Sequence, residues 1–372
     1  MNPFQQGEQG APKTILVIVT RRIGDVLLTT PLIRSLKNAW PDAQIDALLF
    51  DGTEGILAAN PDIRDLITIA ARPSLGEHLG LLGKIWRRYD LAASVIPGDR
   101  PTIYAWAAGK FRVGIAVASA KHRWKQLLLN RWAPLDDLNT HTLLMNLKLA
   151  DLLGIEPGHE VIVSWSGEDE KQARLLLPFD MDATPYALLH PYPMYAYKTW
   201  HRQGWLDLAA WLDRQGMRIV LSGGNSADEL AYVHDLAASL PGDVLNTAGK
   251  LSLGAVGFIA SRAKIYIGPD TAVTHIAAAT GTPTVALYGP SNPVKWGPWP
   301  RDYRGHDGDT GPFVMRGSQT AGNVALVQGN DPRDCVPCLG EGCEKHINSL
   351  SACLQHLPAA RVIAAAEALL YR

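Results

Sequence analysis

The chain has 372 residues, of which 47% are hydrophobic and 19% are charged, and its formal net charge is −1. This length suits two domains of ordinary size, and the near-neutral charge argues against nucleic-acid binding by the surface as a whole. No apolar run approaches the ~18 residues that span a bilayer.

The first 13 residues, MNPFQQGEQGAPK, lack the basic start, apolar stretch and cleavage site of a secretory signal. We interpret residues 1–13 as a flexible leader and expect a cytoplasmic protein. In that compartment the four cysteines of the chain would be reduced or metal-bound rather than disulfide-linked.

The first predicted strand, Thr14–Val19, is an uninterrupted β-branched and apolar run, typical of a buried parallel strand. It leads through Gly24 and Asp25 into a helix predicted over Val26–Trp40. Because the first strand and helix of an α/β sheet meet at its carboxyl edge, Asp25 is expected where such sheets bind ligands. A single glycine is not the G-x-G-x-x-G fingerprint, which argues against a nicotinamide dinucleotide.

Strands and helices then alternate at the spacing of βαβ units, which predicts parallel sheets with right-handed crossovers. The expected strands are residues 44–50, 66–70, 91–96, 112–115, 186–190, 217–222, 265–267 and 284–288. The expected helices are residues 52–59, 75–89, 142–153, 203–214, 227–239, 253–262, 271–280 and 359–371. Polar, Pro-containing sequence before residue 185 marks a hinge. The prediction is α/β: two Rossmann-like domains, 14–170 and 171–358, followed by residues 359–372 as a C-terminal helix.

The segment around Gly268-Pro269 predicts a strand, a tight turn and an Ala-rich helix, with Asp270 and Thr271 as capping candidates. The unpaired N–H groups at such a helix start attract phosphate. Thr271 and His275 stand four residues apart, so they line one face of the helix. The alternative is that Asp270 is a simple cap and His275 a satisfied polar residue under a loop.

Two stretches carry a family resemblance. Residues 18–46 read IVTRRIGDVLLTTPLIRSLKNAWPDAQID, and residues 268–298 read GPDTAVTHIAAATGTPTVALYGPSNPVKWGP. Both resemble the glycosyltransferase family 9 heptosyltransferases, bacterial enzymes that add heptose from ADP-heptose to the lipopolysaccharide inner core. The resemblance implies the GT-B architecture, in which two Rossmann-like domains face each other across a cleft and the C-terminal helix crosses back onto the first domain. It also implies an inverting transfer that needs no metal, with the donor on the C-terminal domain.

By this resemblance Asp25 is the base that takes the proton of the acceptor hydroxyl, and a helix-capping aspartate is the alternative. Lys198, in the family's lysine-then-tryptophan loop, is the clamp for the donor diphosphate, and a solvated loop lysine is the alternative. Together with the N–H groups near Thr271, the ammonium of Lys198 would stabilise the leaving diphosphate without a divalent cation. Asp270 and His275 would then contact sugar and phosphate hydroxyls.

Further donor contacts are expected after the strand that ends near Ser222. Gly223 and Gly224 let a nucleotide approach the backbone closely. Either Asp228 or Glu229 would bind ribose hydroxyls, and Leu251 would pack on adenine. A surface carboxylate and a core leucine explain these last positions equally well.

The acceptor implied by the family is an anionic inner-core saccharide on a lipid at the inner face of the cytoplasmic membrane. The cations expected to meet it are Arg100, Lys121, Arg123 and Lys125. They would also draw the protein to the membrane as a peripheral partner, with no nucleic acid involved. An ordinary solvated charge run is the alternative.

All four cysteines fall in one short segment, with the spacing C-x2-C-x4-C-x9-C. They are Cys335, Cys338, Cys343 and Cys353. The close first pair is typical of a structural metal knuckle, so a structural zinc or iron is one hypothesis. A cluster of reduced thiols and, last, disulfides are the others. No cofactor is expected for catalysis.

Two other functions fit the same architecture. A nucleotide-sugar epimerase would turn over the donor with no acceptor present. A non-catalytic nucleotide-sugar-binding protein would bind ADP and tolerate the loss of Asp25.

Overall fold

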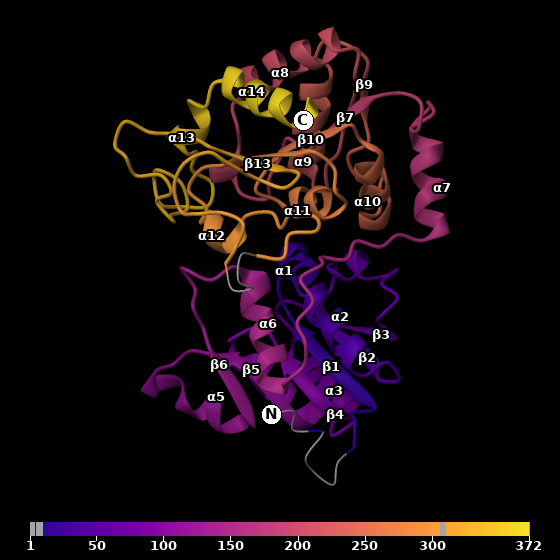
Figure 1. Cartoon of the computed structure of the whole chain (residues 1–372), viewed down its shortest axis with the longest axis vertical. Helices are drawn as coiled ribbons and strands as arrows, with labels where there is room; N and C mark the ends of the chain where they lie inside the picture. The colour runs from indigo at the N-terminus through magenta and orange to yellow at the C-terminus, as the bar shows by residue number, and fades with distance from the viewer. Residues whose placement is uncertain (1–3, 5–9, 306–309, 372) are drawn as a thin grey trace. The chain divides into compact units, whose positions relative to one another are not determined.

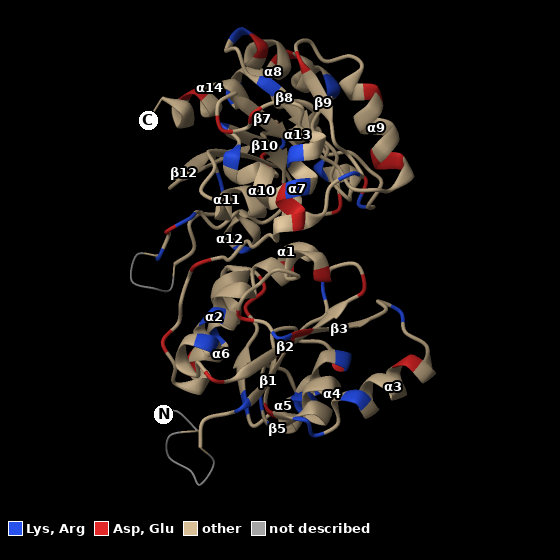
Figure 2. Ribbon diagram, turned by 90° about the vertical axis from the view of Figure 1, so that its right-hand side faces the viewer, with Lys and Arg blue, Asp and Glu red and all other residues tan. Residues whose placement is uncertain are grey.

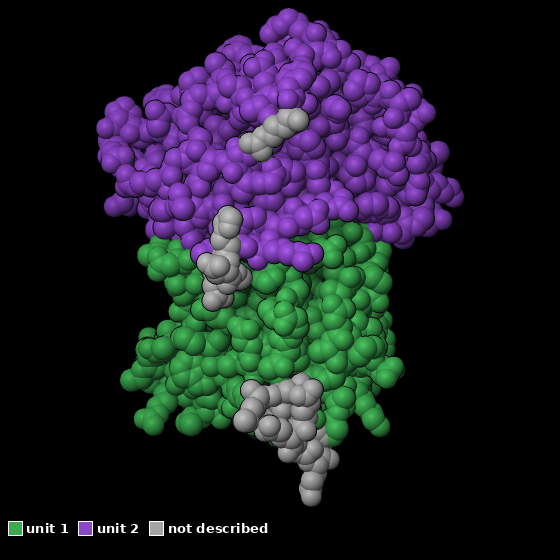
Figure 3. Space-filling model, viewed as in Figure 1, with its two compact units in different colours: residues 1–164 green, residues 165–372 purple. Residues whose placement is uncertain are grey.

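The chain forms two compact units, residues 1–164 and 165–372 (Figure 3). The structure is a computed structural model that describes residue 4 and residues 10–305 and 310–371. The division falls before the expected boundary at residue 170, because α7 (Gly167–Leu176) packs against α10 (Leu253–Arg262) of the second unit. Within the described parts of the chain, no helix has both the length and the apolar character needed to cross a membrane.

The first unit is built on a parallel six-stranded sheet. Its strands are β1 (Thr14–Val19), β2 (Gln44–Phe50), β3 (Asp65–Ile69), β4 (Tyr89–Ser94), β5 (Gly109–Ala116) and β6 (Arg131–Pro134). They lie in the order β3-β2-β1-β4-β5-β6, which is the Rossmann order. Central strand β1 is buried along most of its length, as its apolar run predicts.

Helices cover both faces of this sheet (Figures 1 and 2). They are α1 (Ile23–Leu27), α2 (Thr30–Ala39), α3 (Leu75–Ile85), α4 (Asp99–Ala108), α5 (Arg123–Leu128) and α6 (Thr142–Leu153). Helix α4 packs on β1, β4 and β5 and contacts both α3 and α5. The chain moves across the sheet in one direction from β1 to β3 and in the other direction from β3 to β6. Because the crossovers are right-handed, α2, between β1 and β2, lies on the face opposite α4. Helix α6 contacts α2 and lies on the same face as α2.

The helix predicted over Val26–Trp40 is two helices. It starts earlier, at Ile23, and breaks after Leu27, and α2 then restarts with Pro31 in its first turn. Proline lacks the N–H that a continuous helix would need there but fits a helix start, which explains the break.

The second unit repeats the plan with a seven-stranded sheet. Its strands are β7 (Tyr186–Leu189), β8 (Arg218–Leu221), β9 (Val244–Asn246), β10 (Ile265–Pro269), β11 (Thr284–Tyr288), β12 (Gln319–Ala321) and β13 (Val324–Gln328). The order is β12-β13-β11-β10-β7-β8-β9, and β12 is antiparallel to β13. The parallel part again starts at its centre, with β7, and extends first to one edge and then to the other.

The remaining helices of this unit are α8 (Arg202–Arg214), α9 (Ala227–Ala237), α11 (Ala272–Ala279), α12 (Pro293–Trp296), α13 (Ala352–Gln355) and α14 (Ala359–Leu370). Trp205 and Trp211 of α8 are buried in the core, as their helical spacing predicts. Helix α14 packs on α8, β11 and β13 of its own unit. Its expected crossing to the first domain stays a prediction.

Phe4, which belongs to the predicted leader, is packed against the first unit. Phe4 is buried and packs edge-on against Trp40 and Phe111, with ring centroids 5.4 and 5.5 Å away. The expectation of a flexible leader is therefore wrong at Phe4, because an aromatic ring fills an apolar recess there. Residues 1–3 and 5–9 lie outside the described residues.

Candidate functional site

The carboxyl edge of the second sheet gathers most of the predicted donor residues. Strands β10, β7 and β8 are parallel neighbours, so the loops that follow them start side by side. These loops carry Asp270, His190 and the Ser222–Gly224 segment. The short 3-10 helix Ala196–Lys198, further along the loop after β7, brings Lys198 to the same edge.

Lys198 and Asp270 form a largely buried ion pair at this edge. The Lys198 Nζ donates to Asp270 Oδ2 at 2.5 Å and lies 3.3 Å from the Asp270 carbonyl oxygen. The two side chains are 19% and 8% exposed. Lys198 is thus not the solvated loop lysine of the alternative interpretation, and its charge is fixed beside the start of α11.

Asp270 is held in its ionised form. Burial alone would raise the pKa of this carboxyl, but the positive charge of Lys198, the neighbouring His275 and hydrogen bonds from Lys198 and Ser291 lower it below its ordinary value. Asp270 is also not the N-cap of α11, a position that Thr271 occupies. Its side chain serves the ion pair instead.

His275 is a neutral imidazole in the interior. Burial lowers its pKa to about 4, with Asp270 acting in the opposite direction and Lys198 reinforcing the shift. Its Nδ1 is buried and has no hydrogen-bond partner within the described residues. A buried polar atom without a partner costs roughly 1–3 kcal/mol, so a ligand that bonds to Nδ1 would recover part of that cost.

The N-terminus of α11 supports the same anion-binding chemistry. Thr271 makes no side-chain capping bond to the first N–H groups of the helix, and its Oγ1 lies 3.3 Å from Thr274 Oγ1. Helix starts left uncapped by a side chain are ready partners for phosphate. The arrangement can therefore hold a diphosphate between the helix start and the Lys198 ammonium.

The glycine loop after β8 is partly closed by a side chain. Glu229 accepts a hydrogen bond from the Gly224 N–H at 2.6 Å, and burial raises its pKa although this bond opposes the shift. A Cβ on Gly223 would lie 3.0 Å from the Ala248 side chain, so the absence of a side chain keeps this loop compact. Glu229 is therefore engaged in holding the loop. Asp228, the residue before it in α9, is exposed and is the more accessible of the two carboxylates.

The loop before α10 lies next to the glycine loop. The Gly249 N–H donates to the Gly223 carbonyl at 3.0 Å, which joins the two loops. Leu251 is half-buried two residues further on, neither a core residue nor fully exposed. Its predicted contact with adenine stays a prediction.

Asp25 lies at the carboxyl edge of the first sheet, where the sequence predicts it. It is the third residue of α1 and 8% exposed, and its Oδ1 is 3.6 Å from Arg21 Nε. Arg22 occupies the N-cap position and makes no side-chain capping bond. Asp25 is therefore not an N-cap, and its carboxylate lies beside the Arg21 guanidinium.

Three of the four predicted acceptor cations are exposed. Arg100 begins α4, and Lys121 and Arg123 lie at the start of α5. Lys125 differs: it is 5% exposed and forms an ion pair with Asp99. Lys125 is therefore not an exposed cation like the other three, because it lies buried against Asp99, and its contact with the acceptor stays a prediction.

The four cysteines share one neighbourhood and form no disulfide. Burial and the other three thiols together raise the pKa of Cys353 to about 12. Cys343 Sγ accepts hydrogen bonds from the Ala352 N–H and from Arg333, both at 3.3 Å. Across the described ranges, no three His, Cys, Asp or Glu side chains are arranged as metal ligands.

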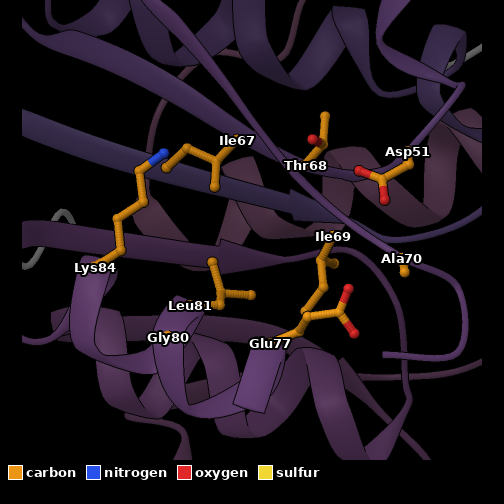
Figure 4. Close-up of a pocket in the computed structure, with 9 residues that line it drawn as sticks. All are labelled: Asp51, Ile67, Thr68, Ile69, Ala70, Glu77, Gly80, Leu81 and Lys84. Carbon is orange, nitrogen blue, oxygen red and sulfur yellow. The ribbon is translucent and has the colours of Figure 1, made fainter. Parts of the chain in front are cut away.

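A pocket of about 260 Å³ lies elsewhere in the first unit, between β3 and α3 (Figure 4). Its charged and polar lining side chains are Asp51, Thr68, Glu77 and Lys84. None of the predicted site residues lines it.

Two polar residues at the sheet edge were not predicted. His190 is buried directly after β7, lies 3.1 Å from the Ser222 Oγ, and has its pKa lowered to about 4 by burial. Ser291, half-buried in the loop after β11, hydrogen-bonds Asp270. The signal that could have found both is their position, since each polar residue lies in the segment that follows a buried strand of the same sheet.

Comparison with known proteins identifies the same family as the sequence motifs. The sequence model of glycosyltransferase family 9 (heptosyltransferase) matches residues 102–312. The lipopolysaccharide heptosyltransferase 3 of Escherichia coli is 30% identical to the chain, and the match covers 74% of this chain and 83% of that protein.

Solved structures of similar fold support the architecture. A glycosyl transferase family 9 protein from Veillonella parvula DSM 2008 superposes with a TM-score of 0.76 at 21% identity, covering 96% of this chain and 97% of the other. The E. coli ADP-heptose lps heptosyltransferase II gives a TM-score of 0.71 at 21% identity, covering 96% and 98%. The predicted fold class, GT-B with two Rossmann-like domains, is confirmed.

Because His190 and His275 are buried, we predict that the folded protein loses stability as the pH falls. Both have pKa values lowered to about 4, so between pH 6.5 and pH 4 the unfolded chain binds protons that the folded chain does not. Stability should then fall as the pH falls through this window, by up to about 1.4 kcal/mol per pH unit for each histidine. Urea unfolding at several pH values measures the slope.

His190→Gln/His275→Gln should flatten that slope, whereas His234→Gln, at an exposed position of α9, should keep it. Equal slopes for the double variant and the wild type would contradict the assignment of buried neutral imidazoles.

Proposed function

Because the chain belongs to the glycosyltransferase family 9 heptosyltransferases, we propose that it transfers heptose from ADP-heptose to an anionic lipopolysaccharide inner-core acceptor. The observation that supports this most is the buried Lys198–Asp270 ion pair beside the start of α11. The relatives' names supply the class of donor and acceptor.

The second unit is assigned to the donor. Lys198 and the N–H groups of α11 would hold the diphosphate, and negative charge grows there as the sugar leaves. Asp270 keeps Lys198 in place, and His275 Nδ1 is poised to bond a donor hydroxyl or phosphate oxygen. Because His275 is neutral, it can act as hydrogen-bond donor or acceptor according to its tautomer.

The first unit is assigned to the acceptor. Asp25 would take the proton of the acceptor hydroxyl as that oxygen attacks the anomeric carbon, with inversion at that carbon. Arg21, whose Nε lies 3.6 Å from Asp25 Oδ1, would hold the carboxylate in position. Arg100, Lys121 and Arg123 would attract the anionic acceptor from the cytoplasmic side of the membrane.

The cysteine segment is assigned a structural role. Its four thiols lie near one another, and we give them no part in the transfer itself. If a zinc or iron ion binds, Cys335, Cys338, Cys343 and Cys353 would hold it and close its coordination.

Asp25→Asn should reduce transfer by ~10²- to 10⁴-fold and leave ADP affinity nearly unchanged, because the base acts on the acceptor. Initial rates and ADP titrations measure the two effects. Asp42→Asn, at an exposed position of the same unit, should behave like the wild type. Wild-type turnover in Asp25→Asn would refute the assignment of the base and would favour a binding protein.

Lys198→Ala should weaken ADP more than adenosine, because the ammonium contacts the diphosphate and not the nucleoside. The variant also leaves the buried Asp270 carboxylate unpaired, at a cost of about 3–5 kcal/mol in stability. Lys198→Ala/Asp270→Asn should regain stability without regaining ADP affinity. Lys264→Ala, at the opposite edge of the sheet, is the control, and equal losses for ADP and adenosine would show that Lys198 does not touch phosphate.

Transfer should survive EDTA, because Lys198 and the α11 N-terminus supply the positive field on the leaving group. Metal analysis of the same sample would detect any ion bound at the cysteine segment. Removing such an ion should lower the stability of the protein and leave the initial rate of transfer unchanged. Rapid inactivation that magnesium or manganese restores would contradict the proposed leaving-group chemistry. Donor breakdown without acceptor would instead identify an epimerase.

A further inference from the structure

Three helices on one face of the first sheet expose large apolar side chains. Helix α4 contacts both α3 and α5, so the three form a single layer. The most exposed apolar residues of the layer are Leu75 (74%), Leu79 (60%), Trp86 (51%), Trp124 (41%) and Leu127 (76%). We call this surface the α3–α5 face. Monomeric soluble proteins scatter such side chains singly, so their concentration in one layer is informative.

The apolar residues of α3 form a stripe that continues onto α4. Leu75, Leu79 and Trp86 follow one another by four and seven residues, which places them on one side of the helix. Leu81 and Ile85 bury the other side in the core. Trp86, just after α3, packs edge-on against Trp106 of α4, with ring centroids 5.5 Å apart.

The same segment is strongly basic. Residues 71–128 contain ten Lys and Arg but three Asp and Glu, a surplus of seven positive charges in a chain whose net charge is −1. Each of the three carboxylates is already engaged. Glu77 caps α3, Asp90 pairs with Lys110, and Asp99 pairs with Lys125.

The remaining cations surround the apolar side chains. Arg72, Lys84, Arg88, Lys121 and Arg123 are exposed, and among the described residues they form no ion pair with a carboxylate. The Arg87 guanidinium lies 5.8 and 5.9 Å from the ring centroids of Trp86 and Trp106. In Figure 2, Lys and Arg (blue) lie on and around α3, α4 and α5.

We propose that the α3–α5 face docks on an anionic lipid bilayer, with its leucines and tryptophans in the headgroup region and its cations against lipid phosphates. Helices with an apolar stripe flanked by Lys and Arg lie in such interfaces, and tryptophan is well suited to the boundary because it is apolar with one N–H donor. The inference rests on the proposed function for the reason to reach a membrane, since that acceptor is anchored in lipid.

The starts of α3, α4 and α5 all follow the carboxyl ends of their strands, the edge at which Asp25 lies. Docking through this face would therefore hold the first unit, to which the acceptor is assigned, at the lipid surface. Lys125 forms an ion pair with Asp99 of the α3–α5 face and is not expected to contact lipid.

The test is sedimentation of the full-length protein with vesicles of phosphatidylcholine alone or mixed with phosphatidylglycerol. Binding should rise with the phosphatidylglycerol fraction and weaken with salt, as the Debye length shortens from ~8 Å at physiological ionic strength to ~3 Å at 1 M. Leu75→Ser/Leu79→Ser/Leu127→Ser should reduce the partition coefficient by about tenfold or more. Lys84→Gln/Arg88→Gln should do the same and lose part of the salt response.

Matched substitutions on the second unit serve as controls. Leu175→Ser and Lys171→Gln change exposed residues of α7 and should leave vesicle binding unchanged. The triple serine variant should keep its rate on an acceptor freed of its lipid and lose rate on the same acceptor embedded in vesicles. Vesicle binding needs no turnover, so its result stands even if the proposed transfer is not observed.

Three outcomes would overturn the proposal. They are wild-type protein that does not bind anionic vesicles at low salt, a triple serine variant that binds as the wild type does, and tighter binding to single-stranded RNA than to vesicles. The last would reassign the face to nucleic acid.

Discussion

The site in the second unit depends on the ion pair between Lys198 and Asp270. A carboxylate as buried as Asp270 needs a cationic partner, because an unpaired buried charge costs several kcal/mol. Pairing keeps Asp270 ionised and fixes the ammonium at the start of α11. The neutral state of His275 has another origin, since burial lowers its pKa while the nearby Asp270 carboxylate acts in the opposite direction. The ion pair thus fixes the position of the ammonium and the ionised state of Asp270.

Sheet topology explains why residues so distant in sequence meet. In both units the chain begins at the centre of the sheet and winds outward in two directions, so loops after neighbouring parallel strands share an edge. Asp270, His190 and Ser222 follow three adjacent strands for this reason. Asp25 holds the equivalent place after the first strand of the first unit. Two copies of one plan therefore provide two equivalent sheet edges, which we propose serve the donor and the acceptor.

The two sheets and the positions of several candidate site residues could be predicted from the sequence. Buried parallel strands are apolar runs, and the residues that follow such runs are readily located. Asp25, Lys198 and the Asp270 loop were located in that way, and the roles that the family motifs suggest for them stay predictions. The burial of Lys125 was not predictable, since a cation in a basic run looks solvated until its partner, Asp99, folds against it. His190 was missed because a single polar residue carries no motif.

The central claim is that the Lys198–Asp270 site takes the diphosphate of an adenine nucleotide sugar. A thermal-shift comparison of ADP-heptose with UDP-glucose and GDP-mannose tests it most directly. A ligand at 100 times its Kd stabilises by about 2.7 kcal/mol, enough to raise Tm measurably. The account predicts a shift with ADP-heptose that exceeds the other two and is lost in Lys198→Ala. A larger shift with the uridine or guanosine sugar, or a full shift in Lys198→Ala, would contradict it.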